Sequence, residues 1–597
     1  MTKELMTGNE AIARGAYEAG IRFAAAYPGT PSSEILENAA RYEDGIHAEW
    51  APNEKVAMES AFGFSVLGGR SMVSMKQVGL NVASDPMFSM AYTGVNGALV
   101  IISADEPGIH SSQTEQDNRY YAKMAKIPML EPADSQECRD MVIEAVRISE
   151  KYKSPVLIRM TTRICHSKGV VELGERKEVP AREYHRDIWQ FTTMPAVSKK
   201  LRVEIEEKVA KYRQESEASP MNRIEDNGSR IGIIANGISR LYARDAFGKD
   251  ASYLDIGFSN PLPLEKIRSF AEGKEKIYVI EETEPFMEEQ VKALGIDCTG
   301  RDKLTGCGEL STRLLKKELL GEEETLIETD PDELVGRPPA LCAGCSHRPV
   351  FYDLGKRKDI VVSGDIGCYG LGAMPPLNGV DTILCMGNSV SAGHGMAKAA
   401  EIYGTDKKVV SVIGDSTFFH SGMTGLLDVV YNGSDTVTII LDNRTTGMTG
   451  HQDHPGTGYT AQGEFTKEAD LEAIVRALGV SHVWSLDPLN MRLFHETLDE
   501  ALALDEPSVI ICRRPCSLKK LSGRDLEEFG REKDRCRVDP EKCVGCKVCL
   551  GCGCPALRFD QENGRAEIDP LSCNGCEVCA QICPVSAISK ETKEGRA

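Results

Sequence analysis

Residues 409–443 read VVSVIGDSTFFHSGMTGLLDVVYNGSDTVTIILDN. A β-branched run at 409–413 stops at Gly414-Asp415-Ser416, and a segment of helical length leads to a second apolar run, 436–441. In such a strand–helix–strand unit the carboxyl ends of both strands lie at one edge of a parallel sheet, so Asp415 and Asn443 converge there. Two oxygen ligands beside a helix N-terminus favour a magnesium ion that carries a diphosphate. A βαβ turn with an acidic helix cap is the alternative.

Length and charge narrow the class of protein. The chain has 597 residues, which predicts about four domains. A net charge of −20 and the lack of a basic tract argue against nucleic-acid binding. The first twenty residues are polar and amphipathic, unlike a signal peptide, and no apolar run reaches the length of a membrane span. We therefore expect a soluble, cytoplasmic protein that does not bind membranes.

Twelve of the twenty cysteines follow residue 511. Without a secretion signal, this density favours metal binding over disulfides. Two runs carry the pattern: Cys543-x2-Cys546-x2-Cys549 before Cys554-Pro555, and Cys573-x2-Cys576-x2-Cys579 before Cys583-Pro584. In two-cluster ferredoxins the fourth cysteine of each run binds the other cluster.

That rule predicts two [4Fe–4S] clusters in a ferredoxin-like domain at 535–597. Cluster one takes Cys543, Cys546, Cys549 and Cys583, and cluster two takes Cys573, Cys576, Cys579 and Cys554. The first run departs from the pattern by one inserted residue and by Cys552, so the assignment of Cys554 depends on the proline after it. Zinc is the alternative metal.

Residues 1–190 are predicted to form an α/β domain. A strand at 22–27 leads to Pro28, Gly29 and Thr30, where backbone amides and a hydroxyl suit an anionic group, although a plain capped loop is the alternative. Polar loops also follow the strands at 71–75 and 98–103. Lys76 and Arg119 in these loops are candidates for binding a substrate carboxylate, or are solvated loop cations.

The middle of the chain is predicted as a charged helical connector, 191–228, and a small α/β domain, 229–330. Gly237 alone is too little for a dinucleotide fingerprint. The acidic run 322–332 marks the boundary to the next domain, 335–520, which contains the opening stretch.

A third cysteine group lies in this domain. Cys342-x2-Cys345 and Cys368 are candidate ligands of one more cluster, with Cys516 as the fourth ligand and Cys512 as its rival. Buried, non-ligating cysteines are the alternative. The small-residue stretch that contains Gly387, Asn388, Ser389 and His394 suits close approach of a cofactor ring. The loop 444–459, with His451 and His454, is long enough to close over a reacting centre, although its length also fits simple mobility.

The opening stretch resembles the magnesium–diphosphate motif of thiamine-diphosphate enzymes, Gly-Asp-Gly followed about thirty residues later by Asn, with Ser416 in place of the last glycine. The resemblance implies that Asp415, the Asn443 side chain and the Thr445 carbonyl hold magnesium. Glu54, with Gly63 nine residues later, resembles the glutamate that activates the aminopyrimidine in these enzymes. Glu49 and Glu59 are its rivals, and a helix-capping role is the alternative.

Taken together, the order of parts resembles the alpha (large) subunits of the indolepyruvate ferredoxin oxidoreductase family, within the thiamine-diphosphate-dependent 2-oxoacid:ferredoxin oxidoreductases. The matching stretches are 8–10, 27–31, 75–81, 111–113, 342–348, 364–368 and the cysteine tail. The fold class expected is multidomain α/β, with doubly wound parallel sheets that bind thiamine diphosphate and an α+β two-cluster ferredoxin domain. Domain 1–190 would bind the pyrimidine, domain 229–330 would be transketolase C-terminal-like, and domain 335–520 would bind the diphosphate and magnesium.

The resemblance implies oxidative decarboxylation of aryl-pyruvates with coenzyme A to aryl-acetyl-CoA and CO2, electrons passing through the clusters to an external ferredoxin. It also implies a smaller beta subunit in an α2β2 assembly. The residues expected to contact the cofactors are Glu54, Pro28, Gly29, Thr30, Gly364, Asp365, Gly367, Cys368, Gly387, Asn388, Ser389, His394, Gly414, Asp415, Ser416, Asn443 and Thr445.

Two other functions are open at this point. A non-oxidative 2-oxo acid decarboxylase would release aldehyde without an electron acceptor. An electron-transfer subunit with an inactive thiamine domain would have no physical need to keep Glu54, Asp415 and Asn443 together.

Overall fold

The computed structural model describes residues 2–323, 330, 334–336, 338–530 and 534–591, in two compact units. The first unit comprises Met1–Glu328 with Ala461–Gly463, and the second comprises Thr329–Thr460 and Glu464–Ala597. The predicted boundary at 322–332 falls partly outside the described residues. Among the helices described, none is both long and apolar enough to span a bilayer.

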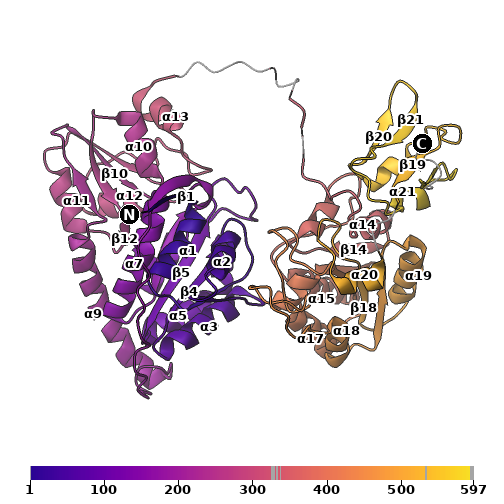
Figure 1. The fold of residues 1–597 in the computed structure, drawn as a ribbon, viewed down its shortest axis with the longest axis horizontal. Coiled ribbons are helices and arrows are strands. Elements are labelled where there is room, and N and C mark those ends of the chain that lie inside the picture. Colours follow the sequence, from indigo (N-terminus) through magenta and orange to yellow (C-terminus); the bar gives the residue numbers. More distant parts are fainter. Residues whose placement is uncertain (1, 324–329, 331–333, 337, 531–533, 592–597) are drawn as a thin grey trace. The chain divides into compact units, whose positions relative to one another are not determined.

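The first unit is built on a seven-stranded sheet, parallel except at one edge (Figure 1). Its strands, in spatial order, are β12 (Phe258–Asn260), β6 (Met129–Leu130), β7 (Val156–Thr161), β5 (Ala98–Asp105), β4 (Arg70–Lys76), β2 (Phe23–Ala26) and β3 (His47–Trp50). Alternate residues of β5 enter two separate apolar cores, one on each face of the sheet. Apolar residues on both faces are typical of a parallel sheet covered by helices on both sides.

One core contains side chains of α1 (Gly8–Glu18), α2 (Ser33–Ala40) and α7 (Ser135–Tyr152). The opposite core contains side chains of α3 (Glu54–Val66), α5 (Ser84–Thr93) and α6 (Arg119–Ala125). The sheet is therefore doubly wound, as the sequence predicts. A short antiparallel pair, β1 (Lys3–Thr7) with β8 (Lys168–Glu172), lies beside it.

A second sheet of four strands follows in the same unit. Its strands, in spatial order, are β13 (Lys276–Ile280), β10 (Ile231–Asn236), β11 (Ser252–Ile256) and β9 (Arg223–Glu225). β9 falls within the predicted connector and pairs with β11, so a start of the small domain at 229 is too late. The rest of the connector contains α9 (Pro195–Ala218), as its helical composition predicts. β12, also from the small domain, pairs antiparallel with β6 of the large sheet.

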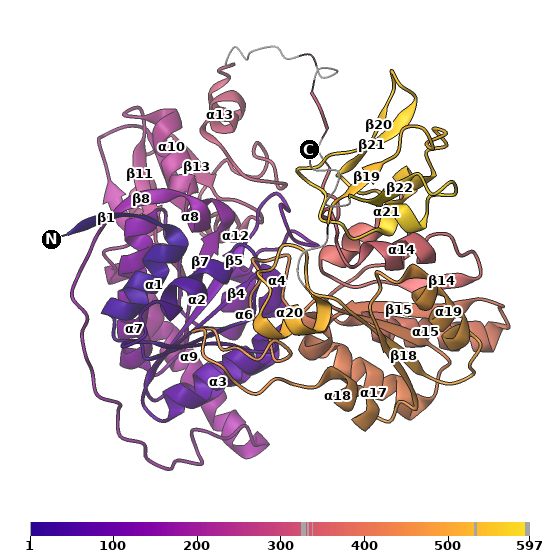
Figure 2. The same ribbon diagram turned by 45° about the vertical axis from the view of Figure 1, so that its right-hand side comes forward.

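The second unit contains a five-stranded, fully parallel sheet (Figure 2). Its strands, in spatial order, are β14 (Ile360–Ser363), β15 (Lys408–Gly414), β16 (Val437–Asp442), β18 (Ser508–Arg513) and β17 (His482–Leu486). Two apolar cores again cover its faces. α15 (Asn388–Tyr403) precedes β15, and α17 (Met423–Asn432) joins β15 to β16. The strand–helix–strand order of 409–443 is thus confirmed.

The cysteine-rich tail forms two antiparallel pairs, β19 (Cys536–Val538) with β22 (Ile588–Lys590) and β20 (Leu557–Asp560) with β21 (Arg565–Ile568). Its apolar residues share a core with those of α14 (Arg348–Leu354) and α19 (Met491–Leu502). Gln581 in α21 (Val578–Gln581) donates to the Leu489 carbonyl at 2.8 Å and accepts from the Met491 amide at 3.1 Å. The tail therefore packs on one face of the parallel domain (Figures 1 and 2).

Candidate functional site

Asp415 lies directly after β15, where the residue is only 3% exposed. Its Oδ1 accepts from the Ser416 amide at 2.8 Å, and its Oδ2 accepts from the Arg444 amide at 2.8 Å. His454 places Nε2 3.1 Å from the same Oδ2. Burial alone would raise the pKa of Asp415, but His454 and the two amides outweigh it, so the net pKa lies below its ordinary value. Asp415 is thus an oriented, ionised carboxylate at the carboxyl edge of the sheet.

Asn443 lies at the same edge, after the neighbouring strand β16. Its Nδ2 is 3.3 Å from Nε2 of His347, which is buried, and its Oδ1 accepts from the Thr445 amide at 3.2 Å. Burial lowers the pKa of His347 to about 4 even though Asp415 opposes the shift. A neutral His347 can accept from the Asn443 amide, which fixes the direction of the Asn443 carbonyl oxygen. Hard oxygen donors held in this way fit magnesium.

Asp365 organises the turn that opens α15. Its carboxylate accepts from the amides of Ile366, Gly387 and Ser389, each at 2.8 Å, and burial raises its pKa to about 6. Close packing explains the glycines: a Cβ at Gly414 would lie 2.6 Å from the ring of Tyr369, and one at Gly367 would lie 2.4 Å from it. The predicted small-residue stretch therefore lies near the site.

His394 is an exception. Its Nδ1 contacts Ser434 Oγ at 2.5 Å, and Ser434 precedes β16, at the end of the sheet opposite to Asp415. Its predicted contact with a cofactor is wrong, because α15 runs away from the carboxyl edge and carries His394 with it.

Glu54, the first residue of α3, lies in the first unit and is 4% exposed. Asn53 caps this helix by accepting from the Val56 amide at 2.9 Å. A Cβ at Gly79 would lie 2.6 Å from Glu54 Oε1, so the glycine leaves room for the carboxylate. The rival Glu59 is instead paired with Lys55 on the exposed side of the helix. A Cβ at Gly63 would meet no described atom within 4 Å, so this glycine is not packed closely within the chain.

Two polar loops lie near Glu54 at the carboxyl edge of the large sheet. Lys76 packs against Gly29 and donates from Nζ to the Ser111 carbonyl at 3.2 Å. Burial lowers the pKa of Lys76, while Glu106 and Glu54 act in the opposite direction. Sequence reasoning missed Glu106, which is buried and accepts from Ser111 Oγ at 2.9 Å. Its position directly after the strand β5, where ligand-binding residues of parallel sheets lie, could have identified it from the sequence.

Arg119 does not lie in this group. It is fully buried and paired with Asp117 and Glu281, and it also donates to the Glu282 and Glu284 carbonyls. Its donors are taken by Asp117 of the same domain and by Glu281 and two carbonyls of the small domain, so the prediction that it binds a substrate carboxylate is wrong.

The structure brings together Cys342, Cys345, Cys368 and Cys516 in the second unit. The pKa of Cys345 is raised to about 12, mainly by burial. The Cys368 and Cys516 thiols raise it further by smaller amounts. Burial and then Cys516 and Cys342 raise the pKa of Cys368 to about 11. The rival Cys512 lies in β18, buried in the apolar core.

This cysteine group adjoins the Asp415 edge. The Cys516 amide donates to the Asn443 carbonyl at 3.0 Å. A Cβ at Gly447 would lie 3.7 Å from Asn443 Nδ2 and 3.8 Å from Cys368 Sγ. The predicted magnesium ligand and the predicted proximal cysteines are therefore immediate neighbours.

The cluster-one cysteines form a second group. Burial, followed by the thiols of Cys583, Cys543 and Cys546, raises the pKa of Cys549. These are the four residues that the alternating ferredoxin rule assigns to one cluster.

The cluster-two cysteines line a common cavity, whose cysteines are Cys536, Cys554, Cys573, Cys576 and Cys579. Cys536 was not predicted, because it stands outside any Cys-x2-Cys run; its amide donates to Cys573 Sγ at 3.4 Å. Cys552 is fully buried, and its carbonyl accepts from Arg348 at 2.6 Å. The structure thus places Cys554 in the cavity and gives Cys552 a different contact.

Within the described ranges, no three His, Cys, Asp or Glu side chains are arranged to hold a single metal ion. This agrees with the chemistry of the groups above. Each thiolate of a [4Fe–4S] cluster binds a different iron, and the ligands predicted at the Asp415 edge are one carboxylate, one amide side chain and one backbone carbonyl.

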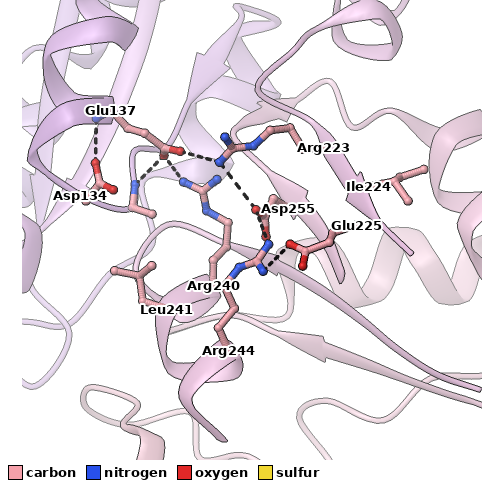
Figure 3. Close-up of a pocket in the computed structure, with 10 residues that line it drawn as sticks. Asp134, Glu137, Arg223, Ile224, Glu225, Arg240, Leu241, Arg244 and Asp255 are labelled. Carbon is pink, nitrogen blue, oxygen red and sulfur yellow. Dashed lines mark hydrogen bonds and ion pairs between the residues drawn. The ribbon is translucent and has the colours of Figure 1, made fainter. Parts of the chain in front are cut away.

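A separate cavity in the first unit contains three arginines (Figure 3). Glu137 pairs with Arg223 and Arg240, and Arg244 donates to Glu225 at 2.7 Å and to Asp255 at 3.0 Å. Because each of these arginines already has a carboxylate partner, the cavity is poorly suited to a diphosphate.

Three family models match this chain. They are a pyruvate flavodoxin/ferredoxin oxidoreductase thiamine-diphosphate-binding domain at 14–223, a thiamine pyrophosphate enzyme C-terminal TPP-binding domain at 365–512, and a 4Fe-4S binding domain at 566–589. The chain is thus a thiamine-diphosphate and iron–sulfur oxidoreductase chain of mixed α/β fold.

Curated relatives match over nearly the whole length. Proteins named indolepyruvate oxidoreductase subunit IorA are 42% identical in Methanothermobacter marburgensis, over 98% of this chain and 97% of that one, and 39% identical in Pyrococcus horikoshii, over 99% and 97%. A solved 2-oxoglutarate:ferredoxin oxidoreductase from Magnetococcus marinus is 16% identical, with a TM-score of 0.44 over 53% of this chain and 65% of that one. On the sequence relatives, the chain belongs to the family of indolepyruvate oxidoreductase subunit IorA.

Proposed function

We propose that this chain is the large subunit of an enzyme that oxidatively decarboxylates aryl-pyruvates such as indolepyruvate, with coenzyme A, to aryl-acetyl-CoA and CO2. The observation that carries the proposal is that the diphosphate edge adjoins the proximal cysteine group: the Cys516 amide donates to the Asn443 carbonyl at 3.0 Å. A Cβ built at Gly447 would also lie within 4 Å of both Asn443 Nδ2 and Cys368 Sγ. The names of the relatives support the choice of substrate.

The second unit would hold the diphosphate end of the cofactor. Asp415, Asn443 and the Thr445 carbonyl would bind magnesium, His454 and the Arg444 amide keep Asp415 oriented, and His347 orients Asn443. The turn at Gly387–Ser389, held by Asp365, would lie beside the cofactor.

The first unit would supply the proton chemistry. When bound, thiamine diphosphate supplies an electron sink for decarboxylation of the 2-oxo acid. Glu54 would hold a proton at its carboxylate against a ring nitrogen, because it is buried where Gly79 leaves room for it. Lys76, beside Gly29 and Thr30, is placed to bind the substrate carboxylate.

We also propose three [4Fe–4S] clusters, one for each cysteine group, with an external ferredoxin as the acceptor. Each group supplies four predicted ligands, and thiolates are soft ligands that suit iron–sulfur clusters. A smaller beta subunit and an α2β2 assembly complete the proposal, with domains at 1–190, about 223–330, 335–520 and 535–597.

The test is anaerobic titration of the holoenzyme with indolepyruvate while cluster absorbance is recorded. The expected result is substrate-dependent bleaching that is lost in Glu54→Gln and kept in the matched control Glu59→Gln, whose side chain lies on the exposed side of the same helix. Consumption of indolepyruvate to aldehyde with unchanged clusters would instead identify a non-oxidative decarboxylase. Bleaching that persists in Glu54→Gln would remove Glu54 from the mechanism.

A further inference from the structure

Arg348 is a buried cation without a carboxylate partner. It is the first residue of α14 and is 1% exposed. No ion pair links it to any residue that the structure describes, and its Nε has no hydrogen-bond partner. A buried charge of this kind is costly unless opposite charge lies near it.

The groups that do contact Arg348 belong to two different cysteine loops. Nη2 donates to the Cys342 carbonyl at 2.9 Å and also to the Leu341 carbonyl, on the proximal loop. Nη1 donates to the Cys552 carbonyl at 2.6 Å, next to the cluster-two ligand Cys554. The guanidinium therefore joins the backbones of both loops.

A third cysteine loop, which carries other cluster-two ligands, touches the proximal loop directly. Asn574, between Cys573 and Cys576, donates from Nδ2 to the Ala343 carbonyl at 3.2 Å. Gly344 has φ of +69°, and a Cβ there would overlap the Asn574 side chain. The proximal loop 342–345 and the cluster-two loop 573–576 are therefore in van der Waals contact, with Arg348 beside them.

Electrostatics point in the same direction. The guanidinium is held by carbonyls of both loops, so its positive charge lies close to both predicted cluster sites. A fixed cation in that place favours added negative charge on both sides. Four thiolates around a [4Fe–4S] core leave a net negative charge, which would supply the missing counter-charge.

We propose that Arg348 is a positioning residue that serves as the shared counter-charge of the proximal and second cluster sites and raises the reduction potentials of both. The inference rests on the proposed function, because it requires a cluster at the proximal cysteines. Reduction of either cluster adds one electron and breaks no bond, so a nearby fixed cation stabilises the reduced form through charge alone.

The experiment is a dithionite titration of the anaerobic holoenzyme, followed by EPR, with no 2-oxo acid present. Arg348→Met, which keeps the side-chain length but not the charge, is expected to shift the reduction equilibrium of both clusters at least tenfold, about 59 mV more negative for one electron. Arg348→Lys, which keeps the positive charge, is expected to shift the reduction equilibrium of both clusters by less than tenfold. The matched control is Arg357→Met, because Arg357 follows the same helix but is paired with Asp353 and Asp499.

Each outcome decides one point. Unshifted potentials in Arg348→Met with full iron content would overturn the role of Arg348, and so would equal shifts in Arg357→Met. If Arg348→Met binds no iron, Arg348→Lys decides: wild-type potentials support the role of the charge, and a shift of tenfold or more in the reduction equilibrium of either cluster overturns it. A wild-type enzyme that lacks the proximal cluster would instead contradict the proposed cluster count.

Discussion

Replacing Cys516 with alanine should cost the enzyme one cluster, and the structure supplies a matched control four residues earlier. Cys516 affects the pKa of Cys345 and of Cys368, and its amide is bonded to the magnesium-edge residue Asn443. Cys512 is 3% exposed and packs in the apolar core. Cys516→Ala therefore tests the loss of a predicted cluster ligand, and Cys512→Ala tests the loss of a buried sulfur that is not a predicted ligand.

The expected magnitudes follow from these surroundings. Three clusters hold about twelve irons per chain, so Cys516→Ala should retain about eight, or about eleven if a three-iron cluster survives. Cys512→Ala should keep all of its iron and lose about 1 kcal/mol of stability, since a small cavity replaces a buried sulfur.

The assay is iron and sulfide content of the anaerobically purified holoprotein, with EPR after reduction and urea unfolding as the measure of stability. The reasoning would be refuted by a Cys516→Ala protein with the same iron content and EPR spectrum as wild type. Loss of iron in Cys512→Ala with retention in Cys516→Ala would make Cys512 the ligand instead.

Three further predictions concern other parts of the chain. His347→Ala should weaken binding of magnesium and thiamine diphosphate 10- to 100-fold, measured by calorimetry, because Asn443 loses the partner that orients it. The control His482→Ala, at a half-buried histidine paired with Glu506, should leave the affinity unchanged, and equal affinities in the two variants would contradict the role of His347. Gly79→Ala should reduce turnover about 100-fold, because the added methyl group displaces Glu54. Gly63→Ala should leave turnover unchanged, because open space surrounds this glycine within the chain. Reduced turnover in both variants would mean that another chain packs on Gly63. Burial raises the pKa of Glu282 to about 7 from an ordinary 4.5, so the folded chain keeps a proton that the unfolded chain loses, and stability falls as pH rises through about 7. Glu282→Gln should remove this part of the pH dependence and stabilise the protein by about 1–3 kcal/mol at pH 8. The measurement is urea unfolding at pH 5 and pH 8. An unchanged dependence of stability on pH would contradict the raised pKa of Glu282.

Features set by local spacing could be predicted from the sequence. β15 and β16 follow from two β-branched runs, and parallel pairing then brings Asp415 and Asn443 to one edge. The cysteine groups follow from Cys-x2-Cys spacing and the alternating ligand rule, and which thiols share a cluster stays a prediction.

Features that depend on tertiary partners could not be predicted. Arg119 resembled a loop cation, but its partner Glu281 comes from the small domain. His394 lies in a small-residue stretch suited to a cofactor, yet the direction of α15 carries it to the other end of the sheet. Arg348 gave no signal, because its role depends on the carbonyl of Cys552, some two hundred residues later in the chain.

The pairing of β12 with β6 has a practical consequence for dissecting the protein. β6 has only two residues, and the strand that covers this edge comes from the small domain. A fragment that ends at residue 190 would leave the edge open, and uncovered edges invite aggregation. Expression of residues 1–190 alone should therefore give insoluble protein, whereas a fragment that also contains the small domain should stay soluble.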